Sequence, residues 1–252
     1  MAEELHPPAE TQALPAEERL IFALDVHGDE AARALVETLG DAVQFYKLGL
    51  GLLTSGNYFD LVQWLAEERG HRLFADLKFH DIPATVASAV RGLRGRGIRY
   101  VTVHSDPRVM EAAVVAAGEE IGVLAVTVLT SLDLQDLQRL GHEVPSVQVL
   151  VLQRALLAHA CGCAGVIASG QEAAAIRAAL PASDSPFRVV TPGIRPIGQG
   201  EQAADQKRIV TPADAFARGA DHIVVGRPIR DAADPRAAAL AIQRTIAEFF
   251  QT

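Results

Sequence analysis

Three charged residues, Asp76, Lys78 and Asp81, stand close together where the apolar stretch in segment 74–85, FADLKFHDIPAT, gives way to a polar one. Successive residues of an extended strand point to opposite faces, so Asp76 and Lys78 are predicted to share one face. Asp81 can return to the same place, in this subunit or in a neighbouring one. Opposite charges about 4 Å apart attract by roughly 4 kcal/mol at a protein surface, so an amine between two carboxylates stays protonated. Lys78 is therefore predicted to donate a proton rather than to act as an amine nucleophile.

Lysine is scarce in this chain, because only Lys47, Lys78 and Lys207 among the 23 Lys and Arg residues are lysines. A guanidinium does not release a proton at ordinary pH, whereas an ammonium can. The composition therefore suggests that Lys78 serves proton transfer. The alternative is a surface ion pair, with Asp81 as the N-cap of a helix that starts near Pro83. Two charges on one face of an apolar strand are costly unless something binds there, which favours the functional interpretation.

Short apolar stretches alternate with longer amphipathic ones along most of the chain. Eight are predicted as strands: 20–25, 43–49, 72–78, 100–104, 122–129, 165–168, 188–191 and 222–226. The segments between them with helical apolar spacing include 30–39, 58–68, 85–94 and 147–159. Apolar strands alternating with helices indicate a covered parallel sheet. Eight such units, without a Gly-x-Gly-x-x-Gly turn after the first strand, favour a (β/α)8 barrel over a doubly wound sheet.

Polar residues gather where the predicted strands end, which is where the active sites of such barrels lie. Seven of the eight strands carry candidates at that end, and they include Asp25, Lys47, Asp76, Lys78, His104, Thr130, Ser131, Arg195 and Arg227. The sequence therefore predicts an active site at the rim formed by the C-terminal ends of the strands.

A phosphate site is predicted after the seventh and eighth strands. Gly193 and Arg195 follow one strand, and Gly226 and Arg227 follow the other. Glycine lets a backbone approach a ligand, and arginine forms forked hydrogen bonds with phosphate oxygens. The polar segment 197–206 lies between them and could close over a phosphate. The alternative is that these are surface cations and that the segment is only a connector.

Composition limits the remaining possibilities. Residues 1–18 lack apolar periodicity and are predicted as a flexible N-terminal extension, and residues 19–252 as one barrel domain. There is no apolar run of membrane-spanning length and no signal-peptide pattern, so we expect a cytoplasmic protein without membrane contact. A net charge of −8 argues against nonspecific binding to nucleic acid. Cys161 and Cys163 are predicted to be inert thiols.

Four motifs taken together resemble the bacterial form of the orotidine 5'-phosphate decarboxylase family. They are Asp-x-Lys-x-x-Asp-Ile-Pro-x-Thr at 76–85, Thr-Pro-Gly-Ile-Arg-Pro at 191–196, Asp-Gln-x-Arg-Ile-Val-Thr-Pro at 205–212 and Gly-Arg-Pro-Ile at 226–229. The resemblance covers residues 20–232. It implies a homodimeric (β/α)8 enzyme without cofactor or metal, whose subunits share active sites. Such enzymes convert orotidine 5'-monophosphate to uridine 5'-monophosphate and carbon dioxide in pyrimidine biosynthesis.

The resemblance also implies a role for each matching residue. Lys78 would protonate C6 of the pyrimidine, and Asp76 would lie against the substrate carboxylate. Asp81, Ile82 and Thr85 would reach into the active site of the partner subunit. Asp25 and Lys47 would hold the ribose hydroxyls, and Thr130 and Ser131 would meet the pyrimidine. Arg195, Gln206, Gly226 and Arg227 would hold the phosphate, with Gln199 and Gln202 open as alternatives to Gln206.

Other functions remain open at this point. The magnesium-dependent 3-keto-L-gulonate 6-phosphate decarboxylases and hexulose phosphate synthases share the Asp-x-Lys-x-x-Asp motif, but they carry a metal-binding glutamate near the end of strand two, where this chain has Lys47. A Schiff-base aldolase needs an uncharged lysine, which flanking carboxylates disfavour. A catalytically inactive nucleotide-binding barrel is disfavoured by the three charges at 76–81. His80 and His104 lack typical metal-ligand spacing and are predicted to pack or to form hydrogen bonds.

Overall fold

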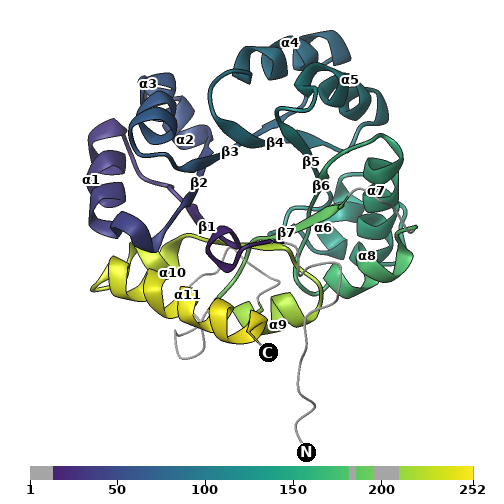
Figure 1. Cartoon of the computed structure of the whole chain (residues 1–252). Coiled ribbons are helices and arrows are strands. Elements are labelled where there is room, and N and C mark those ends of the chain that lie inside the picture. The colour runs from purple at the N-terminus through teal and green to yellow at the C-terminus, as the bar shows by residue number, and fades with distance from the viewer. Residues whose placement is uncertain (1–13, 182–185, 196–209, 252) are drawn as a thin grey trace, which may run out of the picture.

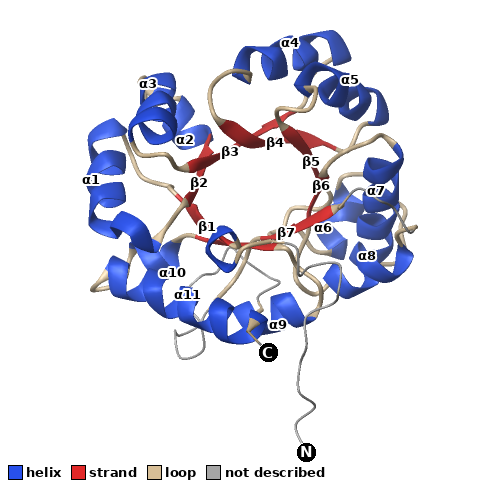
Figure 2. Cartoon of the chain, in the orientation of Figure 1, coloured by secondary structure: helices blue, strands red, loops and turns tan. Residues whose placement is uncertain are grey.

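The strands of the protein close into one parallel barrel. The computed structural model describes residues 14–181, 186–195 and 210–251 of the 252-residue chain. The strands pair in sequence order, and β8 returns to pair with β1, with helices around the outside (Figures 1 and 2). The strands are β1 Leu20–Ala23, β2 Phe45–Gly49, β3 Arg72–Phe79, β4 Ile98–His104, β5 Gly122–Val126, β6 Gly165–Ile167, β7 Arg188–Thr191 and β8 His222–Val225. The predicted (β/α)8 fold is confirmed.

Helices follow the strands and cover the outer face of the barrel. They are α1 Asp29–Leu39, α2 Leu50–Leu53, α3 Tyr58–Gln63, α4 Pro83–Leu93, α5 Pro107–Ala117, α6 Leu134–Arg139, α7 Val147–Ala160, α8 Ala173–Ala179, α9 Pro212–Ala217, α10 Arg227–Arg230 and α11 Pro235–Phe250. Short turns complete the set, with 3-10 turns at Ala16–Glu18 and Gly40–Ala42 and a π-helical turn at Trp64–Glu68 that continues α3.

Proline and a preceding polar cap start several helices. Asp106 accepts a hydrogen bond from the Val109 amide before α5, and Thr211 and Asp234 cap α9 and α11 in the same way. Proline tolerates the first helical turn because its missing amide hydrogen has no partner there. Pro83 likewise starts α4, so this helix begins two residues before the predicted segment 85–94. Its N-cap is Ile82, not Asp81 as the surface-pair alternative required.

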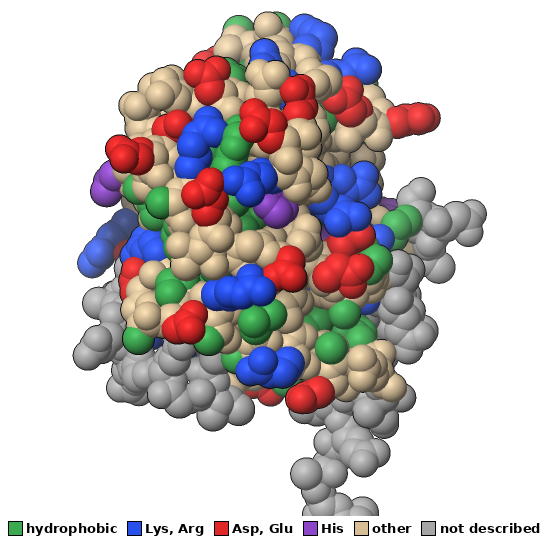
Figure 3. Space-filling model, turned by 60° about the vertical axis from the view of Figure 1, so that its left-hand side comes forward, with side chains coloured by type: hydrophobic (Ala, Val, Ile, Leu, Met, Phe, Trp, Pro, Cys, Tyr) green, Lys and Arg blue, Asp and Glu red, His purple; other side chains and the backbone are tan. Residues whose placement is uncertain are grey.

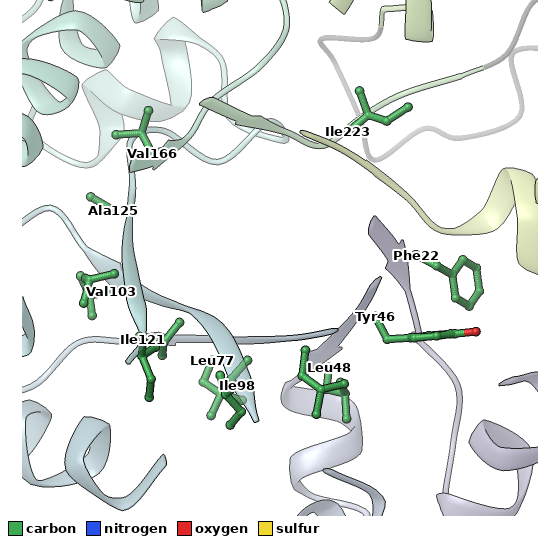
Figure 4. Close-up of a cluster of buried hydrophobic side chains, with 14 of the residues drawn as sticks. Phe22, Tyr46, Leu48, Leu77, Ile98, Val103, Ile121, Ala125, Val166 and Ile223 are labelled. Atoms are coloured by element: carbon green, nitrogen blue, oxygen red, sulfur yellow. The ribbon is translucent and has the colours of Figure 1, made fainter. Parts of the chain in front are cut away.

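Alternation along the strands produces two apolar layers. One set of side chains fills the barrel interior and includes Ile21, Phe45, Phe74, Tyr100 and Leu124. The alternate set points outward to the helices; Phe22, Tyr46, Leu77 and Val166 are among those that Figure 4 shows turned away from the barrel axis. Both layers are buried, which explains why the strands are nearly continuous apolar runs.

The last part of the predicted extension 1–18 is structured. Residues 16–18 form a 3-10 turn, and the Glu18 carboxylate pairs with Arg72 at 2.6 Å. The Leu14 carbonyl accepts a hydrogen bond from Arg19 at 2.8 Å. Residues 14–18 are therefore held against the barrel, whereas residues 1–13 lie outside the described part of the chain.

Charges of both signs are interspersed on the face of the molecule shown in Figure 3. Such a mixture, together with the net charge of −8, offers no extended positive surface on that face for a nucleic acid backbone. Among the described residues, no helix has the length and apolar character needed to cross a bilayer.

A buried polar cluster lies at the opposite end of the barrel from the polar strand ends. Asp221, just before β8, pairs with Arg177 and, at 3.1 Å, with Arg188. The adjacent His222 is only 1% exposed. Its Nδ1 lies 2.9 Å from the Glu18 carbonyl oxygen and its Nε2 3.3 Å from the Tyr100 hydroxyl, partners that a neutral ring protonated on Nδ1 satisfies. Burial lowers the pKa of His222 to about 4; the nearby Asp221 opposes this effect without reversing it.

This cluster predicts a dependence of folding stability on pH. Unfolded His222 gains a proton below about pH 6.5, but the folded protein resists protonation until about pH 4. The contribution of His222 to the free energy of unfolding is therefore fully present above pH 6.5. It falls by about 3 kcal/mol as the pH drops to 4. Urea unfolding of the His222→Gln variant should show a correspondingly smaller loss over this range. The control is the His27→Gln variant, altered at an exposed histidine, which should lose as much stability as wild type over this range. If the free energy of unfolding of His222→Gln depended on pH as it does in wild type, the assignment would be contradicted.

Candidate active site

The C-terminal ends of the strands surround a cavity of about 480 Å³. This volume falls in the usual range for small-molecule sites. The predicted site residues that line it are Asp25, Lys47, Asp76, Lys78, Thr130, Arg195, Gly226 and Arg227. They come from β2 and β3, from the loops that follow β1, β5 and β7, and from the junction of β8 with α10, so the barrel brings together residues from six strand ends.

Four charges of alternating sign form a chain along one wall of the cavity. Lys78 Nζ lies 2.8 Å from Asp76 Oδ1, and Lys47 Nζ lies 3.2 Å from Asp76 Oδ2. Lys47 Nζ also lies 3.3 Å from Asp25 Oδ1. Asp76 and Lys78 point to the same side of β3, as strand alternation predicts. The sequence Asp25, Lys47, Asp76, Lys78 is therefore a continuous ion-pair chain, called the charge chain below.

Burial and pairing act in opposite directions on the charge chain. Burial alone would raise the pKa of Asp76, which is 8% exposed, but Lys47, Lys78 and Thr102 together bring it below the ordinary value. Burial alone would lower the pKa of Lys47, but the carboxylates of Asp76 and Asp25 raise it overall. Both groups therefore stay charged at neutral pH. Lys78 is the member at the end of the chain, with its side chain 31% exposed.

The backbone of Lys78 is unusual. Its φ is +48°, a left-handed value that no other non-glycine residue of the described chain adopts. Such a conformation is unfavourable for a side chain with a Cβ atom and requires support from its surroundings. The pairing of β3 with β4 also shifts here, because Ala75 pairs with Val101 and Phe79 with Val103. Residues 76–78 therefore face the single residue Thr102 in a bulge.

Thr102 supports this bulge, although sequence reasoning missed it. Its fully buried hydroxyl accepts a hydrogen bond from the Lys78 amide at 2.9 Å and donates one to Asp76 Oδ1 at 2.9 Å. The available signal was its position: it lies between Tyr100 and His104 in the alternation of strand four, and so on the inner face. Arg230 was also missed; it lines the cavity and donates to the Asp25 carbonyl at 2.7 Å.

The wall on the β5 and β6 side of the cavity is mainly apolar. Val126, Val128, Leu129 and Ile167 line it, with the buried Thr130 beside them. Leu129 is a partly exposed large apolar side chain at the cavity surface. One side of the cavity thus presents charges and the other presents apolar surface.

The loops after β7 and β8 form the remaining side of the cavity. Gly193 has φ +77°, and the turn that it makes is tied down by a bridge between Ile194 and Val210. The Arg195 amide donates to the Val210 carbonyl at 3.0 Å. After β8, Gly226 lies so near β1 that a Cβ atom on it would stand 3.3 Å from Ala23 Cβ. Arg195 and Arg227 add cationic side chains to the cavity lining here.

Several predicted site residues lie away from this cavity. Asp81, Ile82, Thr85 and Ser131 are exposed and do not line it. Asp81 Oδ1 accepts a hydrogen bond from the Ile82 amide at 2.6 Å, and the Ile82 side chain is 66% exposed. Within the chain, Asp81 therefore does not flank Lys78. Gln206 and its alternatives Gln199 and Gln202 lie outside the described residues.

His80 and His104 pack against each other near the site, with ring centroids 4.8 Å apart. Burial, followed by His80 and nearby cations, lowers the pKa of His104. Across the described residues, no group of three or more His, Cys, Asp or Glu side chains is placed to hold a metal ion. Lys47 itself places an ammonium between the Asp25 and Asp76 carboxylates that could otherwise share a cation.

The chain is similar to known proteins in both sequence and fold. Residues 18–242 match the model of the orotidine 5'-phosphate decarboxylase / HUMPS family. The chain is 51% identical over 237 residues to the orotidine 5'-phosphate decarboxylase of Methylococcus capsulatus, covering 94% of this chain and 95% of that protein. It is 54% identical over 228 residues to the protein of the same name from Ruegeria pomeroyi, covering 90% and 93%.

The solved structure of orotidine 5'-phosphate decarboxylase from Lactobacillus acidophilus has the same fold, with a TM-score of 0.75 and 33% identity. The match covers 90% of this chain and 98% of that one. The resemblance in the four motifs is thus confirmed, and with it the enzyme class. On its sequence, its barrel and the match over residues 18–242, the chain belongs to the orotidine 5'-phosphate decarboxylase / HUMPS family.

Proposed function

We propose that this enzyme converts orotidine 5'-monophosphate to uridine 5'-monophosphate and carbon dioxide in pyrimidine biosynthesis, with Lys78 as proton donor and without a cofactor. The observation that carries the proposal is the charge chain, which ends in an ammonium exposed to the cavity. The name shared by relatives that are 51% and 54% identical supports the substrate.

The reaction needs a fixed positive charge at one carbon atom. Breaking the bond between C6 and the carboxylate leaves an electron pair in an sp² orbital that cannot spread into the ring. An ammonium held at that place stabilises the developing charge and then gives its proton to C6. Lys78 suits both steps, because its Nζ atom lies 2.8 Å from Asp76 Oδ1 and its side chain lines the cavity.

The other members of the charge chain fix the position of Lys78 and bind the sugar. In the proposal, Asp76 lies beside the substrate carboxylate, and Asp25 and Lys47 hold the ribose hydroxyls. Lys47 contacts both carboxylates, so it also links the sugar-binding group to the reacting one. The pyrimidine lies against the apolar wall near Leu129, with Thr130, and with Ser131 in the exposed continuation of that loop.

The phosphate belongs on the β7 and β8 side of the cavity. Arg195 and Arg227 supply guanidinium groups there, and Gly226 leaves the backbone open to the ligand. Gln206 is proposed as a further ligand, on the motif alone. Binding energy from this remote group can organise the site around the pyrimidine, so part of it contributes to the rate.

The magnesium-dependent members of the superfamily are the main alternative, because the family model includes more than one activity. Those enzymes need an anionic metal ligand near the end of strand two. Here the same region supplies Lys47, whose ammonium lies 3.3 and 3.2 Å from two carboxylates. A divalent cation placed among these groups would face that ammonium, which favours the cofactor-free reaction.

We also propose a homodimer with shared active sites. Asp81, Ile82 and Thr85 are exposed at the start of α4, and the 66% exposure of Ile82 is large for an isoleucine. An apolar side chain flanked by a carboxylate and a hydroxyl suits insertion into a second subunit. In this arrangement the partner subunit contributes the second carboxylate expected beside Lys78.

The role of Lys78 predicts a sharp separation of activity from stability. The Lys78→Ala variant removes both the proton and the localised charge, so kcat should fall by roughly 10⁴-fold or more. Folding stability should fall by no more than about 1 kcal/mol, because the side chain is partly exposed. The fall in ultraviolet absorbance of orotidine 5'-monophosphate measures turnover, with all proteins treated first with a chelator.

The Arg139→Ala variant, which removes a cation with a 78% exposed side chain, serves as the control and should turn over like wild type. Near-normal activity of Lys78→Ala would overturn the assignment. Wild-type activity that disappears with the chelator and returns with magnesium would point instead to metal-dependent chemistry.

Shared active sites predict complementation between two inactive variants. A mixed dimer of Lys78→Ala and Asp81→Ala subunits has one site with both residues intact and one with neither. After unfolding, mixing in equal amounts and refolding, half of the dimers are mixed, so activity should recover to about one quarter of wild type. Refolding each variant alone provides the control. No recovery in the mixture, or a fully active monomer by light scattering, would contradict the proposal.

A further inference from the structure

Thr102 links the two residues at the reacting end of the charge chain. Its hydroxyl is the shared partner of the Lys78 amide and the Asp76 carboxylate, at 2.9 Å from each. A threonine hydroxyl has one proton, and the Lys78 amide needs an acceptor. The proton of Thr102 is therefore committed to Asp76 Oδ1, the same oxygen that pairs with Lys78 Nζ.

This contact stands where the strand ladder is interrupted. Three residues of β3, from 76 to 78, face one residue of β4 at the bulge. A backbone amide that is buried without a hydrogen-bond acceptor destabilises the fold. Thr102 supplies a side-chain acceptor to the Lys78 amide at this interruption, and so holds the left-handed conformation of Lys78 at φ +48°.

Both hydrogen bonds of Thr102 affect the distance between Lys78 Nζ and Asp76 Oδ1. The direction of the Lys78 side chain depends on its backbone, and the direction of the Asp76 carboxylate depends on its hydrogen bonds. One buried hydroxyl constrains both groups, yet Thr102 does not line the cavity. It is therefore placed to set the geometry of the reacting groups without touching the substrate.

We propose that Thr102 is a positioning residue, whose hydroxyl aligns Lys78 and Asp76 for proton transfer through the bulge between β3 and β4. The proposal rests on the proposed function of Lys78 as proton donor. A misalignment of about 1 Å in such a group can lower a rate by roughly 100-fold. The effect should appear in the chemical step and not in substrate binding.

Three substitutions separate the hydroxyl from the volume of the side chain. Thr102→Val keeps the volume and removes the hydroxyl, Thr102→Ser keeps the hydroxyl and removes the methyl, and Thr102→Ala removes both. We expect kcat to fall by roughly 10- to 100-fold in the valine and alanine variants and by less than about threefold in the serine variant. KM for orotidine 5'-monophosphate and Kd for uridine 5'-monophosphate should change by less than about threefold in all of them.

The Thr127→Val variant is the matched control. Thr127 is buried just after the neighbouring strand β5, and its hydroxyl donates to the Ile167 carbonyl at 2.7 Å without contacting Asp76 or Lys78. It should lose stability by a similar amount, measured as Tm, but keep its kcat. If Thr102→Val does not fold, the ratio of kcat between the serine and alanine variants decides the question, because both lack the methyl group.

The proposal is overturned if Thr102→Val retains wild-type kcat, if serine and alanine are equally impaired, or if Thr127→Val loses as much kcat. An inactive wild-type enzyme would instead contradict the proposed function. The two failures are therefore distinguishable in the same assay.

Discussion

The buried carboxylate of Asp76 is the group on which the arrangement of the site depends. A carboxylate removed from water is costly unless charges and hydrogen bonds compensate it. Its partners come from three adjacent strands: Lys47 from β2, Lys78 from its own strand β3, and Thr102 from β4. The parallel pairing of β2 with β3 and of β3 with β4 places these strand ends side by side. The fold therefore keeps this carboxylate ionised at the wall of the cavity.

Strand alternation made part of this site predictable. Asp76 and Lys78 are two residues apart in one strand, so their shared face follows from local geometry alone. The contacts of Lys47 with Asp25 and Asp76 join β2, β3 and the loop after β1, so alternation within a single strand could not predict them. The bulge at Lys78 could not be predicted, because it exists only in the pairing of β3 with β4. Thr102 was missed because threonine is common in strands, so its presence there is no signal. Its partners Lys78 and Asp76 are 24 and 26 residues away in the sequence.

The predictions for Asp25 and Asp81 were limited for separate reasons. Asp25 was placed at the end of strand one, but β1 ends at Ala23, and Asp25 lies in the following loop, where Arg230 holds its carbonyl. The strand ends where its inter-strand hydrogen bonds end, and the apolar pattern of the sequence does not show that position. Asp81 is a different case, because its proposed role needs a second subunit, and within one chain it lies exposed beside Ile82.

The two ends of the barrel divide stability from chemistry. At the N-terminal end, Asp221 is buried between Arg177 and Arg188, and burial keeps His222 neutral. At the other end, Lys78 has an unfavourable backbone conformation and a charge that faces an open cavity. Apolar side chains fill the barrel between them, from Tyr100 near His222 to Phe74 at the cavity floor. A strained and partly exposed lysine costs stability, and it persists because the surrounding barrel over-determines its position. The conformation of Lys78 at one rim therefore depends on the packing of the barrel around it.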